Sequence, residues 1–347
     1  MGVFKHRTRG MQDLEFADGR KGSVRVGITT TIPVEILFAA GYMPVDLNNI
    51  FITRPDSMRL VEEAEAAGYP RNVCGWIKGL YTTVIEDKDI TEVIAVTQGD
   101  CSSTHALMET YQMAGVKTIS FAYPADRDYQ TLKQQMEKLM RHFGTDWPAV
   151  NRMKSKLDEV RRRVWEMDRL TWQENRVSGG DNHYWQVSCS DFCGDAERFK
   201  QAAEEKLAAF RAAPPRTGEL RIGFIGVPPI WHDLYAYLEN LGARVVFNEV
   251  QRQFSMPFAT QDIIEQYLLY TYPYGVFGRI EDIRREAEKR KLDGIIHYVQ
   301  SFCFRQIEDM IIKAKLDLPV MTIEGDKPGA LDARTKLRLD SFVEMLR

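Results

Sequence analysis

The sequence has no long hydrophobic run, few cysteines and almost no net charge. No apolar stretch in its 347 residues approaches the roughly 18 to 20 residues of a membrane span, and its first residues lack the apolar core of a signal peptide. A formal net charge of -3, with 27% charged residues, gives no overall sign of nucleic-acid binding. We therefore expect a cytoplasmic protein whose partners include neither a membrane nor a nucleic acid.

Two common nucleotide-binding motifs are also missing. The run 223–229 starts as Gly-x-x-Gly but lacks the third glycine and the helix-opening spacing of a dinucleotide loop. No Gly-x-x-x-x-Gly-Lys-Ser/Thr sequence occurs. These absences argue against dinucleotide binding and against ATP hydrolysis by a phosphate-binding loop in this chain.

Five cysteines in an expected cytoplasmic chain of this length argue against a disulfide framework. A reducing compartment keeps thiols free, so such cysteines fill the core, catalyse reactions or bind metal. Most single cysteines only pack, as small hydrophobic side chains. The position of each cysteine in the sequence therefore has to indicate whether it takes part in catalysis or metal binding.

What the sequence does contain is an internal repeat. Val24–Ile28 resembles Leu220–Phe224, an offset of 196 residues (24 to 220), and Gln98-x-x-Cys101 resembles Gln300-x-x-Cys303, an offset of 202 (101 to 303). Each Gln-x-x-Cys follows an apolar run and precedes a helical pattern. Such a nearly constant offset indicates two copies of one structural unit.

Alternating apolar runs and amphipathic stretches predict an α/β protein with parallel sheets. We expect two Rossmann- or flavodoxin-like domains from an internal duplication, joined by a helical connecting region. The proposed divisions are an N-terminal α/β domain at 1–150, the helical region at 151–215 and a C-terminal α/β domain at 216–347. Strands are expected near 24–29, 42–47, 93–96 and 117–123, and near 220–227, 243–248, 294–299 and 319–323. The segment 177–191, which contains Ser178-Gly179-Gly180-Asp181-Asn182, is expected to interrupt the helices.

Three of the cysteines have positions that suit a metal cluster. Cys101 and Cys303 lie just past strand ends, where open α/β sheets place their binding loops. Cys74 precedes a helix-forming stretch, and the corresponding segment of the second unit, near Tyr274–Val276, has no cysteine. A four-iron cluster held by three thiolates keeps one iron open. The spacing alone also allows three unrelated thiols.

Four polar residues are candidates for a role beside these cysteines. Gln98 and Gln300 could donate hydrogen bonds to sulfur or cap loop backbone, and the sequence leaves both open. His105 follows Cys101 by four residues and could transfer protons, although a helix-surface histidine is the favoured interpretation. Glu35 could act as a base, but a carboxylate stabilising a helix start is favoured.

Several motifs together resemble the 2-hydroxyacyl-CoA dehydratase family, D-component type, which includes benzoyl-CoA reductase subunits and double-cubane cluster proteins. They are Gly27–Gly41, the Gly-Asp-Cys101 loop, Gln300–Cys303, Thr322–Asp326 and Thr335–Leu339. The resemblance covers nearly the whole chain from about Gly22. It implies two flavodoxin-like domains around a [4Fe-4S] cluster that is held by Cys74, Cys101 and Cys303.

The same resemblance implies a function for the chain. The chain would be the iron-sulfur subunit of a dehydratase, which is a lyase, or of a related acyl-CoA reductase. An ATP-dependent activator protein would deliver one electron at low potential, and radical chemistry on an acyl-CoA substrate would expel its hydroxyl group. A homologous subunit would complete a heterodimer or homodimer.

Cys189 and Cys193 keep two other interpretations open. Their Cys-x3-Cys spacing favours bystander thiols, but they could extend the site toward a double-cubane [8Fe-9S] cluster, as in homodimeric reductases of small molecules in this family. A double cubane needs about six thiolates, and the chain has five cysteines. The last alternative is a chain without catalysis of its own, an electron-relay or binding subunit.

Overall fold

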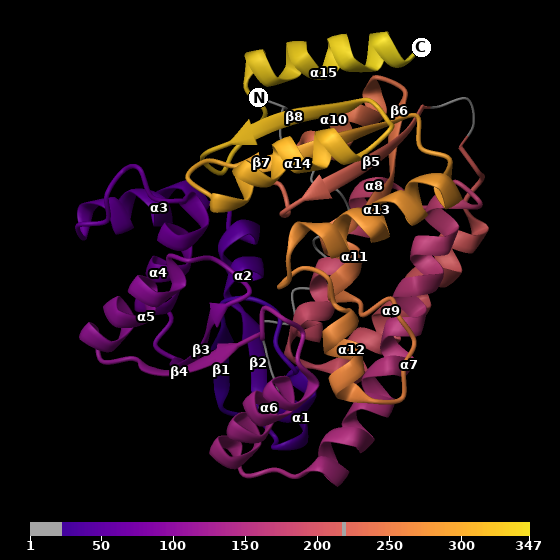
Figure 1. Ribbon diagram of the computed structural model, residues 1–347. Coiled ribbons are helices and arrows are strands. Elements are labelled where there is room, and N and C mark those ends of the chain that lie inside the picture. Colours follow the sequence, from indigo (N-terminus) through magenta and orange to yellow (C-terminus); the bar gives the residue numbers. More distant parts are fainter. Residues whose placement is uncertain (1–22, 217–219) are drawn as a thin grey trace.

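The computed structural model describes residues 23–216 and 220–347. It contains two separate four-stranded sheets in which every strand pairing is parallel (Figure 1). The strand orders are β2-β1-β3-β4 and β6-β5-β7-β8, so the second sheet repeats the order of the first. The expected α/β class with two parallel sheets is therefore confirmed, and the common order is what a duplicated unit predicts.

The strands agree closely with the apolar runs of the sequence. The first sheet comprises β1 (Arg25–Ile28), β2 (Met43–Asp46), β3 (Ile90–Gln98) and β4 (Lys117–Ala122), and the second comprises β5 (Leu220–Gly226), β6 (Ala243–Asn248), β7 (Gly294–Gln300) and β8 (Val320–Gly325). All residues of β6 and β7 are buried, because helices cover both faces of the sheet.

Helices connect the strands and continue between the two sheets. Around the first sheet they are α1 (Val34–Ala39), α2 (Leu47–Thr53), α3 (Ser57–Ala66), α4 (Gly75–Glu86) and α5 (Thr104–Met113). The connecting segment forms α6 (Tyr129–Phe143), α7 (Trp147–Trp172), α8 (Gly179–Val187), the 3-10 turns η1 (Ser188–Ser190) and η2 (Phe192–Gly194), and α9 (Ala196–Ala212). Around the second sheet lie α10 (Leu234–Asn240), α11 (Glu249–Phe254), α12 (Ile263–Leu269), α13 (Val276–Arg290), the 3-10 turn η3 (Phe304–Ile307), α14 (Glu308–Lys315) and α15 (Ala333–Leu346).

Side-chain caps fix the ends of the longer connecting helices. Asp128 accepts a hydrogen bond from the Thr131 amide at the start of α6, and Asp146 accepts one from the Ala149 amide at the start of α7. Such caps satisfy amides that have no partner inside the helix. Gly144, with φ of 73°, ends α6 in the left-handed conformation that glycine adopts without strain.

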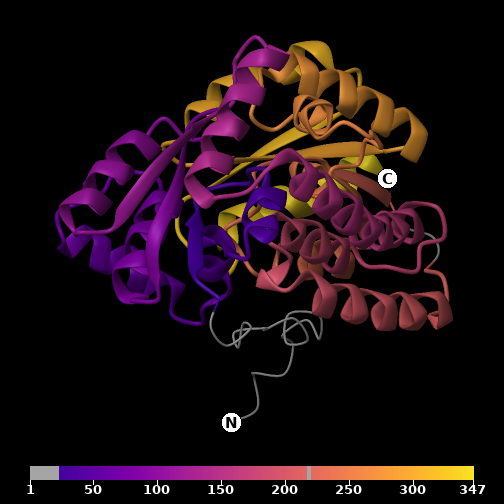
Figure 2. The ribbon, with the colours of Figure 1, turned by 90° about the horizontal axis from the view of Figure 1, so that it is seen from below.

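The connecting helices pack against both sheets, as both ribbon views show (Figures 1 and 2). Helix α7 contacts α1 of the first unit, and α8 contacts β6 and α11 of the second. One hydrophobic cluster joins the first sheet to these helices and to residues 250–274. A second cluster lies between the other sheet, α10 and α15. The boundaries proposed at residues 150 and 215 stay a prediction.

The segment 177–191 differs from its expected form. It was expected to interrupt the helices, but residues 179–187 form α8. Ser178 caps this helix by accepting a hydrogen bond from the Asp181 amide. A Cβ at Gly179 would lie 2.6 Å from the Val245 carbonyl oxygen, so glycine here allows α8 to pack closely on β6.

In the part of the chain that the structure describes, no helix is both long and apolar enough to cross a membrane. The N-terminal residues on which the signal-peptide expectation rests lie outside the described residues. The cytoplasmic location stays a prediction.

Candidate thiol site between the two sheets

Three cysteines lie at helix starts next to the carboxyl ends of the two sheets. Cys74 is the residue before α4, and Cys303 is the residue before η3. Cys101 follows β3, and its carbonyl oxygen accepts a hydrogen bond from the Thr104 amide at the start of α5. Backbone amides near a helix start point outward and favour negative charge. We call Cys74, Cys101 and Cys303 the thiol site.

The structure brings these three thiols close enough to affect one another. Burial, with smaller contributions from the neighbouring Cys101 and Cys303, raises the pKa of Cys74 to about 12. Burial likewise raises the pKa of Cys101 to about 11, with contributions from Asp100 and Cys303. The pKa of Cys303 is raised chiefly by burial. Electrostatic interactions therefore link Cys74 to Cys101 and Cys303, and Cys101 to Cys303.

Backbone amides are directed at each sulfur atom. Hydrogen bonds from the amides of Trp76 and Ile77 lower the pKa of Cys74 against the larger effect of burial. The Ser103 amide acts in the same way on Cys101, and the Arg305 amide on Cys303. Amide donors around sulfur stabilise thiolates and tune the potential of iron-sulfur groups.

The thiol site offers three cysteine side chains, the usual ligands of iron-sulfur clusters. Among the residues that the structure describes, no three His, Cys, Asp or Glu side chains lie close enough together to hold one metal ion. A four-iron cluster binds each thiolate through a different iron, so it needs a wider triangle of sulfur atoms than one ion does. Three thiols with amide donors on each sulfur fit such a group in their chemistry.

A polar contact beside Cys101 joins the two halves of the chain. The hydroxyl of Tyr272 donates to Asp100 Oδ1 at 2.8 Å, and an Arg305 Nη2 donates to the Tyr272 carbonyl oxygen at 2.9 Å. The Arg305 guanidinium lies 4.8 Å from the centre of the Tyr272 ring. Burial raises the pKa of Asp100 to about 6. These contacts hold the Cys101 and Cys303 loops against residues 271–275.

Sequence analysis missed Asp100, Tyr272 and Arg305. Asp100 and Arg305 lie within two residues of a site cysteine, a signal that could have found them. Tyr272 lies in an aromatic run of the sequence, and its contact with Asp100 spans 172 positions. No local pattern indicates a pairing of that range.

The other two cysteines pack in a different hydrophobic cluster. Cys189 is buried with Trp185 and Phe192, and Cys193 packs against the same cluster, which contains neither Cys74 nor Cys101. Between them Asp191 accepts a hydrogen bond from the Asp46 amide at the end of β2, at 2.7 Å. Burial raises the pKa of both thiols. Their position fits side-chain packing near the edge of the first sheet, and iron binding by either thiol stays a prediction.

Glu35 lies in a buried ion pair. It is 0% exposed, and its Oε1 is 2.8 Å from an Arg161 Nη1 on α7. Gln266 and Tyr267 on α12 also donate to its carboxylate. A carboxylate with three such partners ties α1, α7 and α12 together, and this arrangement supports a structural role over a catalytic one.

The remaining candidates differ in burial. Gln300 is buried, accepts a hydrogen bond from Tyr298 and donates to the Asp326 carbonyl oxygen, so it fixes the loop after β8. Its repeat counterpart Gln98 is exposed at the end of β3. His105 is exposed on α5, in agreement with the favoured helix-surface interpretation.

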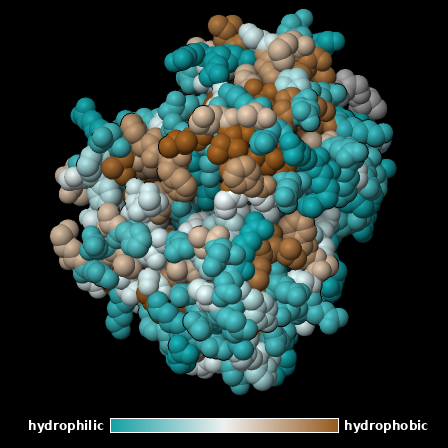
Figure 3. All heavy atoms as spheres, viewed as in Figure 1, coloured by the Kyte–Doolittle hydropathy of each residue, from teal (hydrophilic) through white to brown (hydrophobic). Residues whose placement is uncertain are grey.

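Figure 3 shows hydrophobic side chains gathered over α14 and the turn before it. Phe302, Phe304, Ile307 and Met310 are exposed by 54%, 45%, 70% and 71%. We call these four residues the Phe302 surface. It adjoins Cys303 along the chain. A contiguous apolar surface of this kind is typical of a contact with another molecule.

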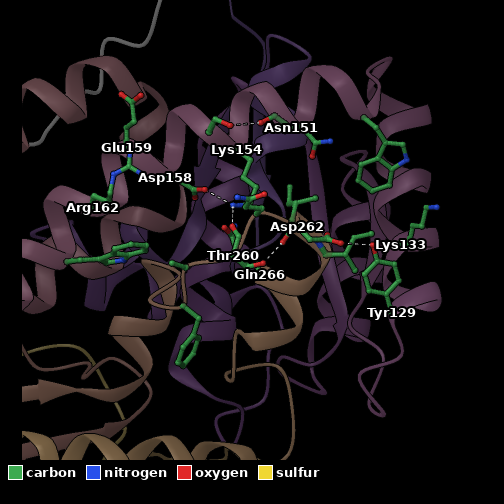
Figure 4. A pocket seen from close by; sticks show the side chains of 18 residues that line it. Tyr129, Lys133, Asn151, Lys154, Asp158, Glu159, Arg162, Thr260, Asp262 and Gln266 are labelled. Atoms are coloured by element: carbon green, nitrogen blue, oxygen red, sulfur yellow. Dashed lines mark hydrogen bonds and ion pairs between the residues drawn. The ribbon is translucent and has the colours of Figure 1, made fainter.

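A large groove lies elsewhere, between α6, α7 and residues 258–266 (Figure 4). Its volume is about 1180 Å³, and none of the five cysteines lines it. Lys154 donates to Asp158 and to the Thr260 carbonyl oxygen, and Tyr129 donates to Asp262. Many of its polar side chains are thus satisfied by one another, and the groove is separate from the thiol site.

Fold and site together define a class: a two-sheet α/β protein with three thiols at the facing strand ends. The comparison with protein families then gives the family. The model of the 2-hydroxyglutaryl-CoA dehydratase D-component matches residues 29–346, nearly the whole chain, so the chain belongs to that family. No match is found among the curated proteins.

Proposed function

We propose that this chain is the iron-sulfur subunit of a 2-hydroxyacyl-CoA dehydratase-type enzyme or of a related acyl-CoA reductase. The proposal is supported by the electrostatic interactions that link Cys74, Cys101 and Cys303, and by the backbone amides that donate hydrogen bonds to each sulfur. Membership of the dehydratase family supports the enzyme class. The reaction and its acyl-CoA substrate are part of the proposal.

In this proposal the three cysteines hold a [4Fe-4S] cluster. When bound, such a group supplies one-electron transfer at low potential and an open iron that can polarise an oxygen atom. The chain's own residues position the ligands. Tyr272 and Arg305 keep the two cysteine loops together through their contacts with Asp100 and the 271–275 segment. Gln300 fixes the loop after β8.

The proposal also includes partner proteins. An ATP-dependent activator would deliver the electron, as the family resemblance implies, and the sequence has no phosphate-binding loop of its own. A homologous subunit would complete the enzyme. The Phe302 surface supports contact with a partner chain, since its apolar side chains are exposed next to Cys303.

The decisive experiment is iron and sulfide analysis of the anaerobically purified chain. We expect about four irons per chain, whereas about eight would favour the double-cubane reductase of small molecules. Replacing Cys74, Cys101 or Cys303 singly by Ser should lower the iron content strongly. Cys189→Ser is the matched control and should retain it. A colourless, folded wild-type chain without iron would refute the proposal.

A second measurement separates the enzyme from an electron-relay subunit. The iron-loaded chain is combined with a reducing activator, ATP and a 2-hydroxyacyl-CoA, and formation of the 2-enoyl-CoA product is followed by chromatography. Product formation that requires this chain's Cys101 supports catalysis. Reduction of the chain without any product, in the presence of a homologous subunit, would favour relay alone.

A further inference from the structure

A small cavity lies beside Cys303, at the carboxyl ends of β5 and β7. Residues from these strands, from α11 and α13 and from the turn that carries Cys303 line it. Its volume is about 10 Å³, which is about the space that one buried water molecule requires. His297 and Cys303 both belong to the lining. The cavity therefore connects a buried histidine with the thiol site.

The imidazole of His297 has a partner on one nitrogen only. Its Nδ1 lies 2.7 Å from Asp309 Oδ1 on α14, and in the part of the chain that the structure describes no group bonds to Nε2. Burial opposes the ionisation of Asp309, but hydrogen bonds from the imidazole, Lys313 and Thr322 lower its pKa. An ionised Asp309 keeps a proton on Nδ1, so Nε2 is the nitrogen that can gain or release one.

The free edge of the ring faces the cavity. Gly226, the last residue of β5, lines the cavity as well, and a Cβ on Gly226 would lie 3.2 Å from Cδ2 of His297. Cδ2 is bonded to Nε2 in the imidazole, so the edge that carries Nε2 lies next to this glycine. The φ of Gly226 is 92°, which favours glycine. A residue without a side chain therefore keeps the space beside Nε2 open.

Two carboxylates interact with His297. Asp309 bonds to the ring, and Glu249 on α11 interacts with it electrostatically. Arg279, the cation of α13 that lines the cavity, is paired with Glu249 at 2.7 Å and with Glu308. Because these neighbours carry compensating charges, His297 can take up a proton without becoming an unpaired buried charge. The other titratable or charged groups here are Tyr272, Tyr298, Cys303 and Arg305 in the lining and Lys313 beside Asp309.

We propose that His297 takes up a proton when negative charge is added at the thiol site, and that a water molecule in the cavity links its Nε2 to Cys303. The inference rests on the proposed function for the identity of the group bound there. One electron arrives from the reductant that the proposed function requires, and one proton arrives from solvent at Nε2. The resulting imidazolium then lies between the Asp309 carboxylate and the added charge, which it stabilises. His297 acts through the water and is a positioning residue.

The first test is the reduction potential of the iron-loaded chain, titrated anaerobically between about pH 6 and pH 8. Uptake of one proton with each electron changes the reduction equilibrium tenfold per pH unit, or about 59 mV. His297→Gln should abolish this dependence and retain the iron. His105→Gln is the matched control, because His105 is exposed on α5 only four residues after Cys101, and it should leave the dependence unchanged. Asp309→Asn should move it to lower pH, because the imidazolium loses its carboxylate partner.

Wild-type iron content separates this inference from the proposed function. If the wild type binds iron and its potential depends on pH equally with and without His297, the inference is wrong and the proposed function stands. The same holds if His105→Gln alone abolishes the dependence. If the wild type binds no iron, the proposed function fails. The link between His297 and Cys303 is then decided on the metal-free chain, which also serves if His297→Gln loses its iron.

In the metal-free chain, the measurement is alkylation of Cys303 by iodoacetamide, with the site identified by peptide mapping. An imidazolium linked to Cys303 favours its reactive thiolate. Below about pH 7 Cys303 should therefore react about tenfold faster in the wild type than in His297→Gln, since a nearby opposite charge lowers a thiol pKa by about one unit or more. Circular dichroism verifies the fold of both chains. Equal rates at Cys303 would overturn the inference.

Discussion

The ion pair between Glu35 and Arg161 provides a strong test of the structural role assigned to Glu35. Both side chains are almost completely buried, at 0% and 1% exposure. Arg161→Met removes the cation and leaves the Glu35 carboxylate with only the neutral donors Gln266 and Tyr267. A buried charge that loses its partner costs about 3–5 kcal/mol of the free energy of unfolding.

The measurement is urea unfolding followed by tryptophan fluorescence at pH 7. Arg161→Met should lower the free energy of unfolding by about 3–5 kcal/mol. Glu35→Gln/Arg161→Met should be more stable than Arg161→Met, because the double variant buries no unpaired charge while Gln still accepts from Tyr267. Arg162→Met, an exposed neighbour on α7, is the control and should change stability by less than about 0.5 kcal/mol.

Two outcomes would refute this account of Glu35. One is an Arg161→Met chain as stable as the Arg162→Met control. The other is a Glu35→Gln chain that unfolds like the wild type but has lost enzymatic turnover with its iron content unchanged. That result would place Glu35 in the catalytic machinery.

Two further predictions concern stability. Burial lowers the pKa of His183 to about 3, so on acidification the unfolded chain, whose histidines titrate near about 6.5, takes up the proton first. The stability that comes from a neutral, buried His183 is therefore complete above about pH 6.5 and falls as the pH drops toward 3. Between pH 7.5 and 5.5 this effect should lower the free energy of unfolding by about 1.4 kcal/mol, and the loss should be absent in His183→Gln. Equal losses in the wild type and the variant would contradict the prediction. Gly99 has φ of 95° and close contact with Pro273, whereas Gly115 has φ of 82° and open space around it. Gly99→Ala should therefore destabilise the chain by about 1 kcal/mol or more beyond Gly115→Ala, and equal urea midpoints would show that the Pro273 contact has no effect.

The strands could be predicted because their signal is local. Gly242 ends one turn and the six residues from Ala243 are the strand β6, as the apolar run indicates. Helix α8 was missed because Gly179 and Gly180 suggested a loop. In the structure Gly179 instead lets the helix approach β6, and this reason is visible only once Val245 is in place.

The candidate site was predictable only in part, because some of its contacts join residues that are far apart in the sequence. The repeat predicts corresponding strand ends for Cys101 and Cys303, and each indeed follows the third strand in the order of its own sheet. The partners of Glu35 could not be predicted, since Arg161 lies on α7 and Tyr267 is separated from Glu35 by 232 positions. Contacts of that range depend on the packing of the connecting helices and leave no periodic pattern in the sequence.

The division of the thiol site between the two sheets has a consequence during synthesis of the chain. Cys74 and Cys101 emerge from the ribosome early, but Cys303 follows only after about 200 further residues (101 to 303). The second sheet must also be nearly complete, because β7 precedes Cys303 and β8 follows it. A nascent chain therefore cannot assemble the three thiols before translation is almost finished, and loading of any group there must come at or after release.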